Sequence, residues 1–386
     1  MSTYMIRPMP PRDPHEPHRA ATPLELLFDL VTVIAVAAAA GALHHAIAEG
    51  YATQGAIRYL MTFFAVWWAW MNFSWFASAY DNDDAIHRVL TMVIMGGALV
   101  LAGGIDRFFG ELAIGWVVAG YVIMRLGMVA MWLRAAWHDP ARQATALRYA
   151  GGIAAAQLFW ICLTLFTDHR AATFPVLILL GFVIELAVPA FAERANATPW
   201  HHHHIAERYG LLTIIVLGEV LTSAAMAIQT AADEPFDVRL IHIALSALVI
   251  TFAMWWLYFA DEENRLLGGQ LHHALQWGYG HSVVFAAGAA VGAGFGVLVD
   301  IVSGHANLPV QVGDFAVAWP LAAYLLGLWF VRDRMVCSGS MRWVLPAFAC
   351  LIALVPLVIP ALEVIAALAV ASLVARYLLR PAPQAG

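Results

Sequence analysis

Long apolar stretches alternate with short polar segments along most of the chain. A helix that crosses a membrane needs about 20 mostly apolar residues, and stretches of this kind occupy residues 24–48, 55–80, 86–105, 112–137, 145–167, 171–192, 204–230, 239–260, 270–302, 314–331, 342–361 and 362–380. The pattern predicts an all-α fold, a polytopic transmembrane helical bundle of about 12 spans. Only the Pro360 region separates the last two stretches, so they could be two spans or one broken segment.

Arginine positions indicate how these spans are oriented. With twelve spans, the N-terminal segment, the even-numbered connections and the C-terminal segment share one side, and most arginines fall there. The connections of the opposite side hold only Arg58, Arg107, Arg170 and Arg239. Because basic residues gather on the cytoplasmic side of a membrane, we expect a multi-pass protein of the bacterial cytoplasmic (inner) membrane with both termini in the cytoplasm.

Composition excludes several classes of protein. Hydrophobic residues make up 62% of the chain and charged residues 12%, about half of the roughly 25% in soluble domains. This excludes a soluble globular enzyme, a disordered chain and a nucleic-acid binder. The cysteines Cys162, Cys337 and Cys350 lie far apart and indicate neither a disulfide framework nor a zinc site. No P-loop, dinucleotide fingerprint or nucleophile elbow is present, so we expect no cofactor and no ATP-driven pump.

The hydropathy pattern suggests four regions. We expect a disordered cytoplasmic tail at residues 1–22, a first six-span membrane repeat at 23–192, a second six-span membrane repeat at 204–380, and a short cytoplasmic tail at 381–386.

A recurring motif supports the two halves. Phe64–Trp68 recurs as Phe252–Trp256, and each copy is followed by an acidic segment, Asp81–Asp84 or Asp261–Asn264. Shared composition alone could make two hydrophobic halves alike, but the repeated Trp pair favours a tandem repeat. Many transporters are built in this way, with a binding site between the repeats near the middle of the membrane.

Two ionisable residues lie deep inside predicted spans. Arg125 is near the middle of the fourth span and Glu219 near the middle of the seventh. A charge at a helix centre costs about 2.5–3.5 kcal/mol on insertion scales, so we expect the two to pair. Such a pair could belong to a transport pathway or could simply fix the register of two helices.

Further polar residues of the first and seventh spans share helix faces. His204, Arg208 and Glu219 form one stripe from the predicted inner surface to the middle of the membrane. Glu25 and Asp29 lie one turn apart, where two carboxylates could share a proton or bind a cation. We expect these residues to line a path for a cation or proton. For the seventh span the alternative is an amphipathic helix entrance with surface-level charges and one buried acid. For the first span the alternative is that acids in the first helical turn complement the helix dipole.

Aromatic and amide residues suggest a cavity or an interface. Asn72 could line a cavity or hydrogen-bond between helices. An aromatic cavity or an interface belt would be formed by Trp67, Trp68, Trp255, Trp256 and Tyr258.

Histidines offer two further candidates. His281 is a candidate for a buried polar site in the ninth span, or it hydrogen-bonds a backbone carbonyl. The run His201–His204 resembles a metal tract, but it lacks paired acidic or Cys ligands at metal-site spacing. We expect this run to be interfacial and leave its metal binding open.

Four segments carry a family resemblance. They are Ala21–Val31, Val66–Trp70 with the Asp81–Asp84 cluster, His204–Leu211 running into Ile214–Glu219, and Trp255–Phe259. In combination and order they resemble the bacterial low temperature requirement protein A (LtrA) family. The resemblance implies an integral membrane protein linked to growth at low temperature, and it implies no particular reaction.

Taken together, these features favour a transporter- or channel-like protein for an ion, a proton or a small solute. Two other classes stay open: a membrane-embedded lipid-handling enzyme, and a non-catalytic stress-related membrane protein. The expected partners are the lipid bilayer, an ion or small-solute substrate and a second copy of the chain in a homo-oligomer, with no nucleic acid.

Overall fold

The computed structural model describes residues 7–14, 16, 19–233, 237–260 and 271–379, and this part of the chain contains helices and no strand. The first group of long helices is α1 (Pro23–Ala48), α2 (Ala52–Tyr80), α3 (Ala85–Glu111), α4 (Gly115–His138), α5 (Gln143–Phe166) and α6 (Phe174–Ala192). The second is α7 (His202–Asp233), α8 (Val238–Phe259), α10 (Leu271–Val302), α11 (Val310–Leu328), α13 (Val344–Val358) and α14 (Leu362–Leu378). Short elements are η1 (Pro140–Arg142), η2 (Trp329–Asp333), α12 (Arg334–Val336) and η3 (Gly339–Trp343).

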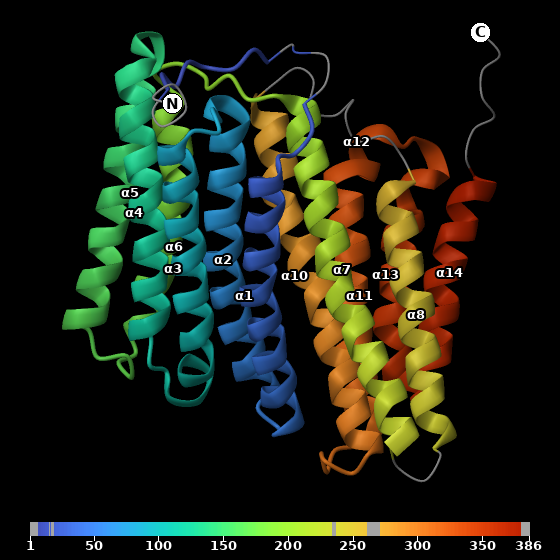
Figure 1. Cartoon of the computed structure of the whole chain (residues 1–386). Coiled ribbons are helices and arrows are strands. Elements are labelled where there is room, and N and C mark those ends of the chain that lie inside the picture. The colour runs from blue at the N-terminus through green and yellow to red at the C-terminus, as the bar shows by residue number, and fades with distance from the viewer. Residues whose placement is uncertain (1–6, 15, 17–18, 234–236, 261–270, 380–386) are drawn as a thin grey trace, which may run out of the picture. The chain divides into compact units, whose positions relative to one another are not determined.

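The chain forms two compact units. Unit 1 comprises Met1–Ala38 and Thr62–Arg208, and unit 2 comprises Ala39–Met61 and Tyr209–Gly386. Helices α1, α2 and α7 therefore contribute one part to each unit. Figure 1 shows that neighbouring helices within a unit run side by side and that their connections lie at the helix ends.

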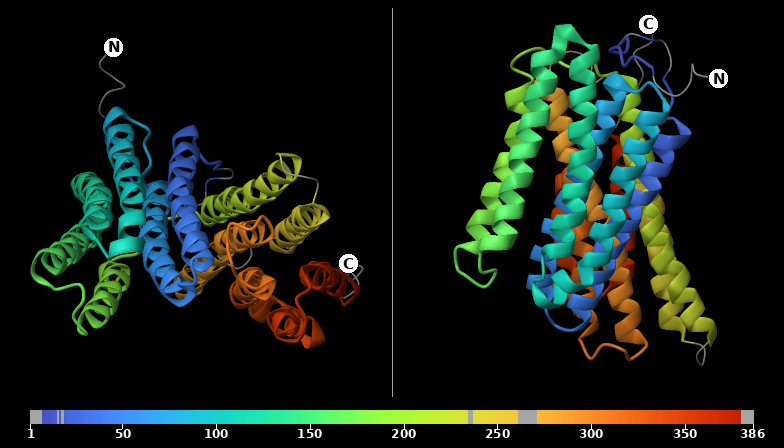
Figure 2. Two further views of the ribbon diagram at one scale, coloured as in Figure 1. Left: turned by 90° about the horizontal axis from the view of Figure 1, so that it is seen from below. Right: turned by 60° about the vertical axis from the view of Figure 1, so that its left-hand side comes forward.

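In unit 1, α3 packs on α4, α4 on α5, and α5 on α6; the left view of Figure 2 shows these teal and green helices grouped together. Glycine permits the closest of these contacts. A Cβ atom added to Gly97 of α3 would lie 2.7 Å from the Gly120 carbonyl oxygen of α4. The α2 side chains Trp68, Trp70 and Phe73 are fully buried. Large aromatic side chains therefore fill the core around α2, while glycine allows the backbones of α3 and α4 to approach closely.

In unit 2, α10 is the central helix. Its Ala- and Gly-rich residues 284–299 are all buried, and it packs against α11. Gly294 faces the backbone of Ala316 and Gly313 faces Leu298, so the two helices run antiparallel. The remaining order is α11 on α13, α13 on α14, and α14 on α8.

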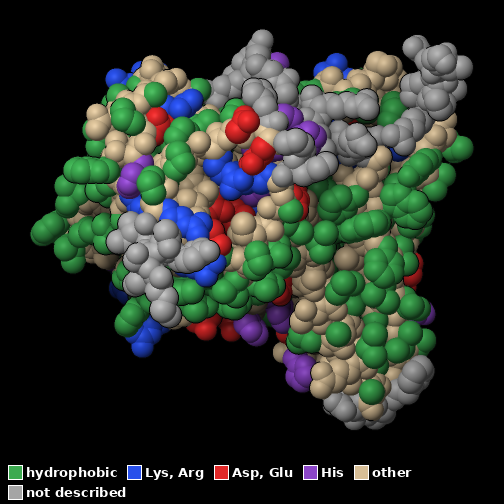
Figure 3. Space-filling view, turned by 45° about the horizontal axis from the view of Figure 1, so that its top comes forward, with side chains coloured by type: hydrophobic (Ala, Val, Ile, Leu, Met, Phe, Trp, Pro, Cys, Tyr) green, Lys and Arg blue, Asp and Glu red, His purple; other side chains and the backbone are tan. Residues whose placement is uncertain are grey.

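Within the described residues, ten helices are long and apolar enough to cross a membrane. Of the other long helices, α14 has 17 residues, and α2 contains four Trp, two Ser and one Asn residue. Large apolar side chains are exposed along the helices, for example Phe166 at 82% and Leu378 at 80%. In Figure 3 hydrophobic side chains cover the flanks, while Arg, acidic and His side chains gather at the helix ends turned toward the viewer. A lipid environment accounts for this distribution.

The predicted spans correspond to these helices. The last two predicted spans form two helices, α13 and α14, which pack on each other across a break at residues 359–361. The count of twelve membrane crossings stays a prediction. The acidic segment 261–264 of the predicted repeat and the tail 381–386 lie outside the described residues.

Candidate functional site

A buried group of four ionisable residues joins α1 to α7 in unit 1. We call Glu25, Asp29, His204 and Arg208 the ion cluster. Arg208 Nη2 lies 2.6 Å from Asp29 Oδ1, and Arg208 Nη1 lies 3.4 Å from Glu25 Oε1. His204 Nε2 lies 3.1 Å from Glu25 Oε1. Each of the four side chains is at most 1% exposed.

Helical spacing builds the ion cluster from the sequence. Glu25 and Asp29 are four residues apart on α1, as are His204 and Arg208 on α7. Residues four apart lie above one another on one helix face, so each helix presents two functional groups to the other. A third pair comes from α2: Trp70 donates its indole N–H to Asp29 Oδ1 at 2.6 Å, and Ser74 Oγ accepts from Arg208 Nη2 at 3.2 Å.

The ion cluster is not fully satisfied. Asp29 Oδ2 and His204 Nδ1 have no hydrogen-bond partner among the described residues. The second oxygen of Glu25 is better bonded, since the backbone N–H of Thr22 donates to Glu25 Oε2 at 2.8 Å. One guanidinium is shared by two carboxylates, and polar atoms that could bind a proton or cation are left over.

Of the predicted path, the structure brings together Glu25, Asp29, His204 and Arg208. Glu219 is not among them: it belongs to the unit 2 part of α7 and is half-buried. This part of α7 packs on α10: Ser223, one turn after Glu219, donates a hydrogen bond to the Gly292 carbonyl of α10 at 2.9 Å.

The expected pairing of Arg125 with Glu219 is wrong. Arg125 Nη2 lies 3.0 Å from Glu185 Oε2 of α6, and both side chains are fully buried. The sequence analysis did not single out Glu185, although it is a lone acid within the apolar run Phe174–Ala192. The same physical argument, that a charge among apolar residues needs a partner, could have found it.

Glu185 is also the acceptor for three neutral donors. Trp68 Nε1 donates to Oε2 at 3.0 Å, while Gln157 Nε2 and Trp160 Nε1 donate to Oε1 at 2.9 and 3.3 Å. We call this group, with Arg125, the Glu185 cluster. The Glu185 carboxylate of α6 thus accepts from donors on α2, α4 and α5, and these hydrogen bonds fix the packing of the four helices.

Other predicted residues have local partners. Asn72 Nδ2 donates to the Trp68 carbonyl of its own helix at 2.8 Å, a hydrogen bond within α2. Trp67 is buried. In unit 2, Trp255 and Trp256 are about half exposed, at 47% and 49%, and Trp256 Nε1 donates to Tyr377 Oη at 2.9 Å. The structure therefore places the first Trp pair in a core and the second at a surface.

His281 forms a small buried site in unit 2. Its Nε2 lies 3.1 Å from Tyr258 Oη and its Nδ1 lies 2.8 Å from the Trp277 carbonyl. The carbonyl contact is one of the two roles expected for this residue.

Metal ligation has little geometric support. In the run 201–204, His201 Nε2 lies 2.8 Å from the Glu16 carbonyl and His204 is in the ion cluster. The described part of the chain contains no group of three or more His, Cys, Asp or Glu residues arranged to hold a metal ion.

The N-terminal segment, predicted as a tail, contacts the helix ends of unit 1. Arg19 donates to the Ala77 carbonyl at 2.6 Å and to the Ser78 carbonyl, which lie at the C-terminal end of α2. The same guanidinium lies 3.9 Å from Asp81. A cation at the C-terminal end of a helix satisfies its last carbonyl groups and complements its dipole.

Asp84 connects three segments in the same region. As the N-cap of α3 it accepts from the backbone N–H of His87 at 2.9 Å; it also accepts from the Arg7 backbone N–H at 2.9 Å and pairs with Arg134 of α4. Burial alone would raise the pKa of Asp84. The hydrogen bonds from Arg134, Arg7 and His87 outweigh burial and lower this pKa to about 2.

Comparisons with known proteins identify a family and a relative of this chain. The chain is 27% identical over 251 residues to the Rhizobium meliloti (strain 1021) protein named "Uncharacterized protein RA0937". The similar region covers 62% of this chain and 58% of that relative. No solved structure matches this chain. Residues 20–378 match the family described as "Bacterial low temperature requirement A protein (LtrA)". This match extends over nearly the whole chain and includes every residue of the ion cluster, so the protein belongs to the LtrA family.

Proposed function

We propose that this protein is a transporter of the bacterial cytoplasmic membrane that moves a proton, alone or together with a small solute. It would cross the membrane twelve times, with both termini in the cytoplasm. The observation that carries the proposal is the ion cluster, in which the first helix of one predicted half, α1, meets the first helix of the other, α7, through buried charges. Binding sites of repeat-built transporters lie where the two repeats meet.

Helix packing supports the two halves. In unit 1 the order of neighbours is α3 on α4, α4 on α5 and α5 on α6; in unit 2 it is α10 on α11, α11 on α13 and α13 on α14. The second Trp of each repeated pair also makes a similar hydrogen bond. Trp68 donates to Glu185 on the sixth helix of the first half, and Trp256 donates to Tyr377 on the sixth helix of the second. These agreements favour duplication over chance similarity of composition.

The charges of the ion cluster favour a proton as the transported or coupled ion. Two carboxylates face one guanidinium, so the cluster has a net charge of −1 when His204 is neutral. The adjoining pair of Arg19 and Asp81 is balanced by itself. A buried group is least costly when it is neutral, and one bound proton makes this cluster neutral. Two atoms are available to take this proton, the ring nitrogen Nδ1 of His204 and the carboxylate oxygen Oδ2 of Asp29, since neither has a hydrogen-bond partner among the described residues.

The experiment is proton flux in proteoliposomes that contain a pH-sensitive dye. With an imposed pH gradient and potassium–valinomycin to set the potential, the parent protein should acidify or alkalinise the lumen faster than empty vesicles. Asp29→Asn and Glu25→Gln should abolish this flux. The matched control is Asp139→Asn, which removes another buried, arginine-paired carboxylate at the end of α4, away from the ion cluster; it should retain flux.

Two results would oppose the proposal. One is an absence of protein-dependent proton flux under every imposed gradient, including with candidate solutes added. The other is equal flux, per folded protein, in the Asp29→Asn and Asp139→Asn variants. The first result would favour the non-catalytic class of membrane protein, and the second would mean that proton flux does not depend on the ion cluster.

A further inference from the structure

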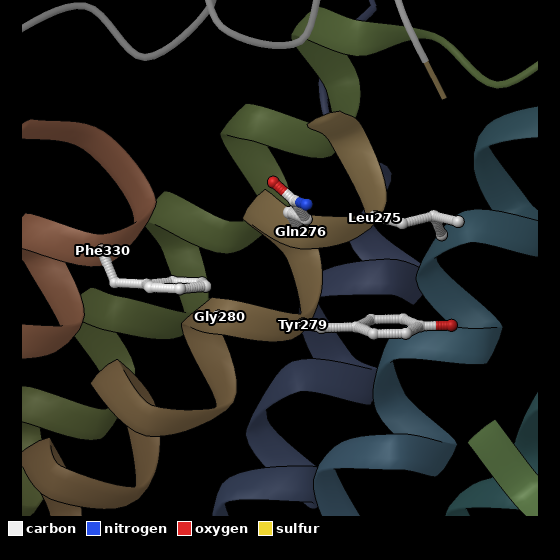
Figure 4. Close-up of a pocket in the computed structure, with 5 residues that line it drawn as sticks. All are labelled: Leu275, Gln276, Tyr279, Gly280 and Phe330. Carbon is white, nitrogen blue, oxygen red and sulfur yellow. The ribbon is translucent and has the colours of Figure 1, made fainter. Parts of the chain in front are cut away.

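A hollow on unit 2 lies beside the irregular turn that follows α11. It has a volume of about 480 Å³ and is lined by Leu275, Gln276, Tyr279, Gly280 and Phe330. Figure 4 shows Phe330 of η2 reaching toward Gly280, while the other lining residues come from successive turns of α10. Apart from the Gln276 amide and the Tyr279 hydroxyl, these residues present carbon surface.

Close packing of η2 on α10 forms one wall of the hollow. Gly280 has no side chain, and a Cβ atom there would come within 2.6 Å of Val331 Cγ1 and 2.8 Å of Phe330 Cδ1. The chain opposite is the π-helix η2, whose wider turn adds a residue relative to an α-helix. Arg332 and Asp333 of this turn are buried, and Arg332 donates to the carbonyls of Leu257 and Tyr258. Phe330 is left at the surface, where it is 37% exposed.

A basic side chain borders the hollow. The Arg334 guanidinium carbon lies 3.8 Å from the centre of the Phe330 ring, and Arg334 Nη2 lies 3.3 Å from Gln276 Oε1. Its Nε donates to the Phe330 carbonyl at 2.6 Å. A guanidinium has five N–H donors, and these two hydrogen bonds are the ones it makes within the described residues. The remaining donors lie on a side chain already fixed at the rim.

The surroundings are those of a lipid headgroup region. Trp329 and Trp343 lie with ring centres 5.9 Å apart, and Trp343 is 57% exposed beside Arg342. Trp and Arg residues at helix ends mark the membrane–water interface. From the hollow toward the middle of the helices, Val283 and Leu326 are exposed, at 46% and 42%. Apolar surface therefore extends from the Arg334 rim along α10 and α11.

We propose that this hollow binds an anionic phospholipid, with its phosphate on Arg334 and an acyl chain along Gly280, Val283 and Leu326. Charge complementarity selects the headgroup, because a guanidinium fixed by a ring and an amide presents several N–H donors to phosphate oxygens. The apolar walls favour a chain and not a free anion. Basic pockets between membrane helices bind acidic headgroups by the same chemistry. This site is separate from the ion cluster and does not depend on proton transport.

The test uses the purified full-length protein, delipidated in detergent and titrated with phosphatidylglycerol or phosphatidylcholine, with binding followed by native mass spectrometry. The parent protein should prefer phosphatidylglycerol. Arg334→Gln should weaken binding of phosphatidylglycerol by about fivefold, as expected for one basic residue at a membrane surface, and should leave phosphatidylcholine unchanged. Gly280→Leu should weaken both lipids. An excess of glycerol 3-phosphate should not compete.

A matched control is available in unit 1. Arg148 also stacks on a phenylalanine, with its guanidinium carbon 5.2 Å from the Phe191 ring, and it donates to the Phe191 carbonyl at 3.5 Å. Arg148→Gln should retain the parent's lipid preference. The proposal is overturned if Arg334→Gln and Arg148→Gln bind phosphatidylglycerol equally, if the parent binds both lipids equally, or if glycerol 3-phosphate displaces the lipid. These comparisons remain decisive even if Gly280→Leu fails to fold.

Discussion

Arg208 and Asp29 are 179 residues apart in sequence, yet their side chains form a 2.6 Å ion pair with no exposed surface. The same guanidinium also lies 3.4 Å from Glu25, so one cation faces two carboxylates. The pair therefore links α1 to α7, and Arg208 supplies the positive charge that offsets the carboxylates of the ion cluster.

Removing one partner of this pair should destabilise the protein. Arg208→Gln leaves two buried carboxylates without their guanidinium, and breaking a buried ion pair costs about 3–5 kcal/mol. The double variant Arg208→Gln with Asp29→Asn leaves Glu25 beside His204, so it should recover part of the loss. Thermal unfolding in detergent micelles measures both. A double variant no more stable than Arg208→Gln alone would contradict this account.

The Glu185 cluster provides a second test. Arg125→Gln should lower stability by about 3 kcal/mol, because it leaves Glu185 buried without its cation. Adding Glu185→Gln should restore part of that loss, whereas adding Glu219→Gln should not. The comparison of unfolding temperatures among these three variants distinguishes the observed pairing from the one expected from sequence. Rescue by Glu219→Gln instead would refute the assignment.

Acid should weaken the contact between the N-terminal segment, α3 and α4. The pKa of Asp84 is lowered to about 2 in the folded protein, below its unfolded value of about 3.9. This lowered pKa stabilises the folded state by about 2–3 kcal/mol. The stabilisation is fully present above about pH 5 and is lost as the pH falls through the folded-state pKa. The difference in unfolding temperature between the parent and Asp84→Asn should therefore shrink over this range. A difference that stays constant from pH 6 to pH 2 would count against the Asp84 contacts.

Two adjacent glycines of α3 should respond oppositely to alanine. A Cβ at Gly97 would lie 2.7 Å from backbone and side-chain atoms of α4, while a Cβ at Gly96 would meet nothing within 4 Å. Gly97→Ala should cost about 1–3 kcal/mol through overpacking, and Gly96→Ala should gain up to about 1 kcal/mol through helix propensity. Unfolding temperatures of the two variants in one detergent give the comparison. Equal shifts would mean that α3 and α4 are not in close contact at this position.

Much of the helical framework could be predicted from the sequence. Stretches of about 20 apolar residues leave the backbone no alternative to helix in lipid, so the predicted spans match the helices closely. Glu25, Asp29, His204 and Arg208 could also be singled out, since helical spacing places each pair on one face.

What the sequence could not supply was the partner of each charge. Hydropathy indicates how deep Arg125 and Glu219 lie within their predicted spans, but it indicates neither the rotation nor the neighbours of the two helices. Their similar depth therefore suggested a pair, whereas Arg125 pairs with another acid. Arg125 pairs with Glu185, whose own span is among the most apolar and carries no other polar signal. Pairing depends on which helices pack together, and that order is set by glycine contacts and aromatic volume spread over many residues.

The π-turn of η2 holds one residue more than an α-helical turn. Because the wider turn takes up this extra residue, the side chains after it keep the rotational phase of the helix before it. A deletion in the regular helix Val310–Leu328 would instead turn η2 and Arg334 together by about 100° around the axis. Arg334 would then leave Gln276, and Arg332 would leave the carbonyl groups of α8. Ahead of this turn the number of residues therefore matters as much as their identity.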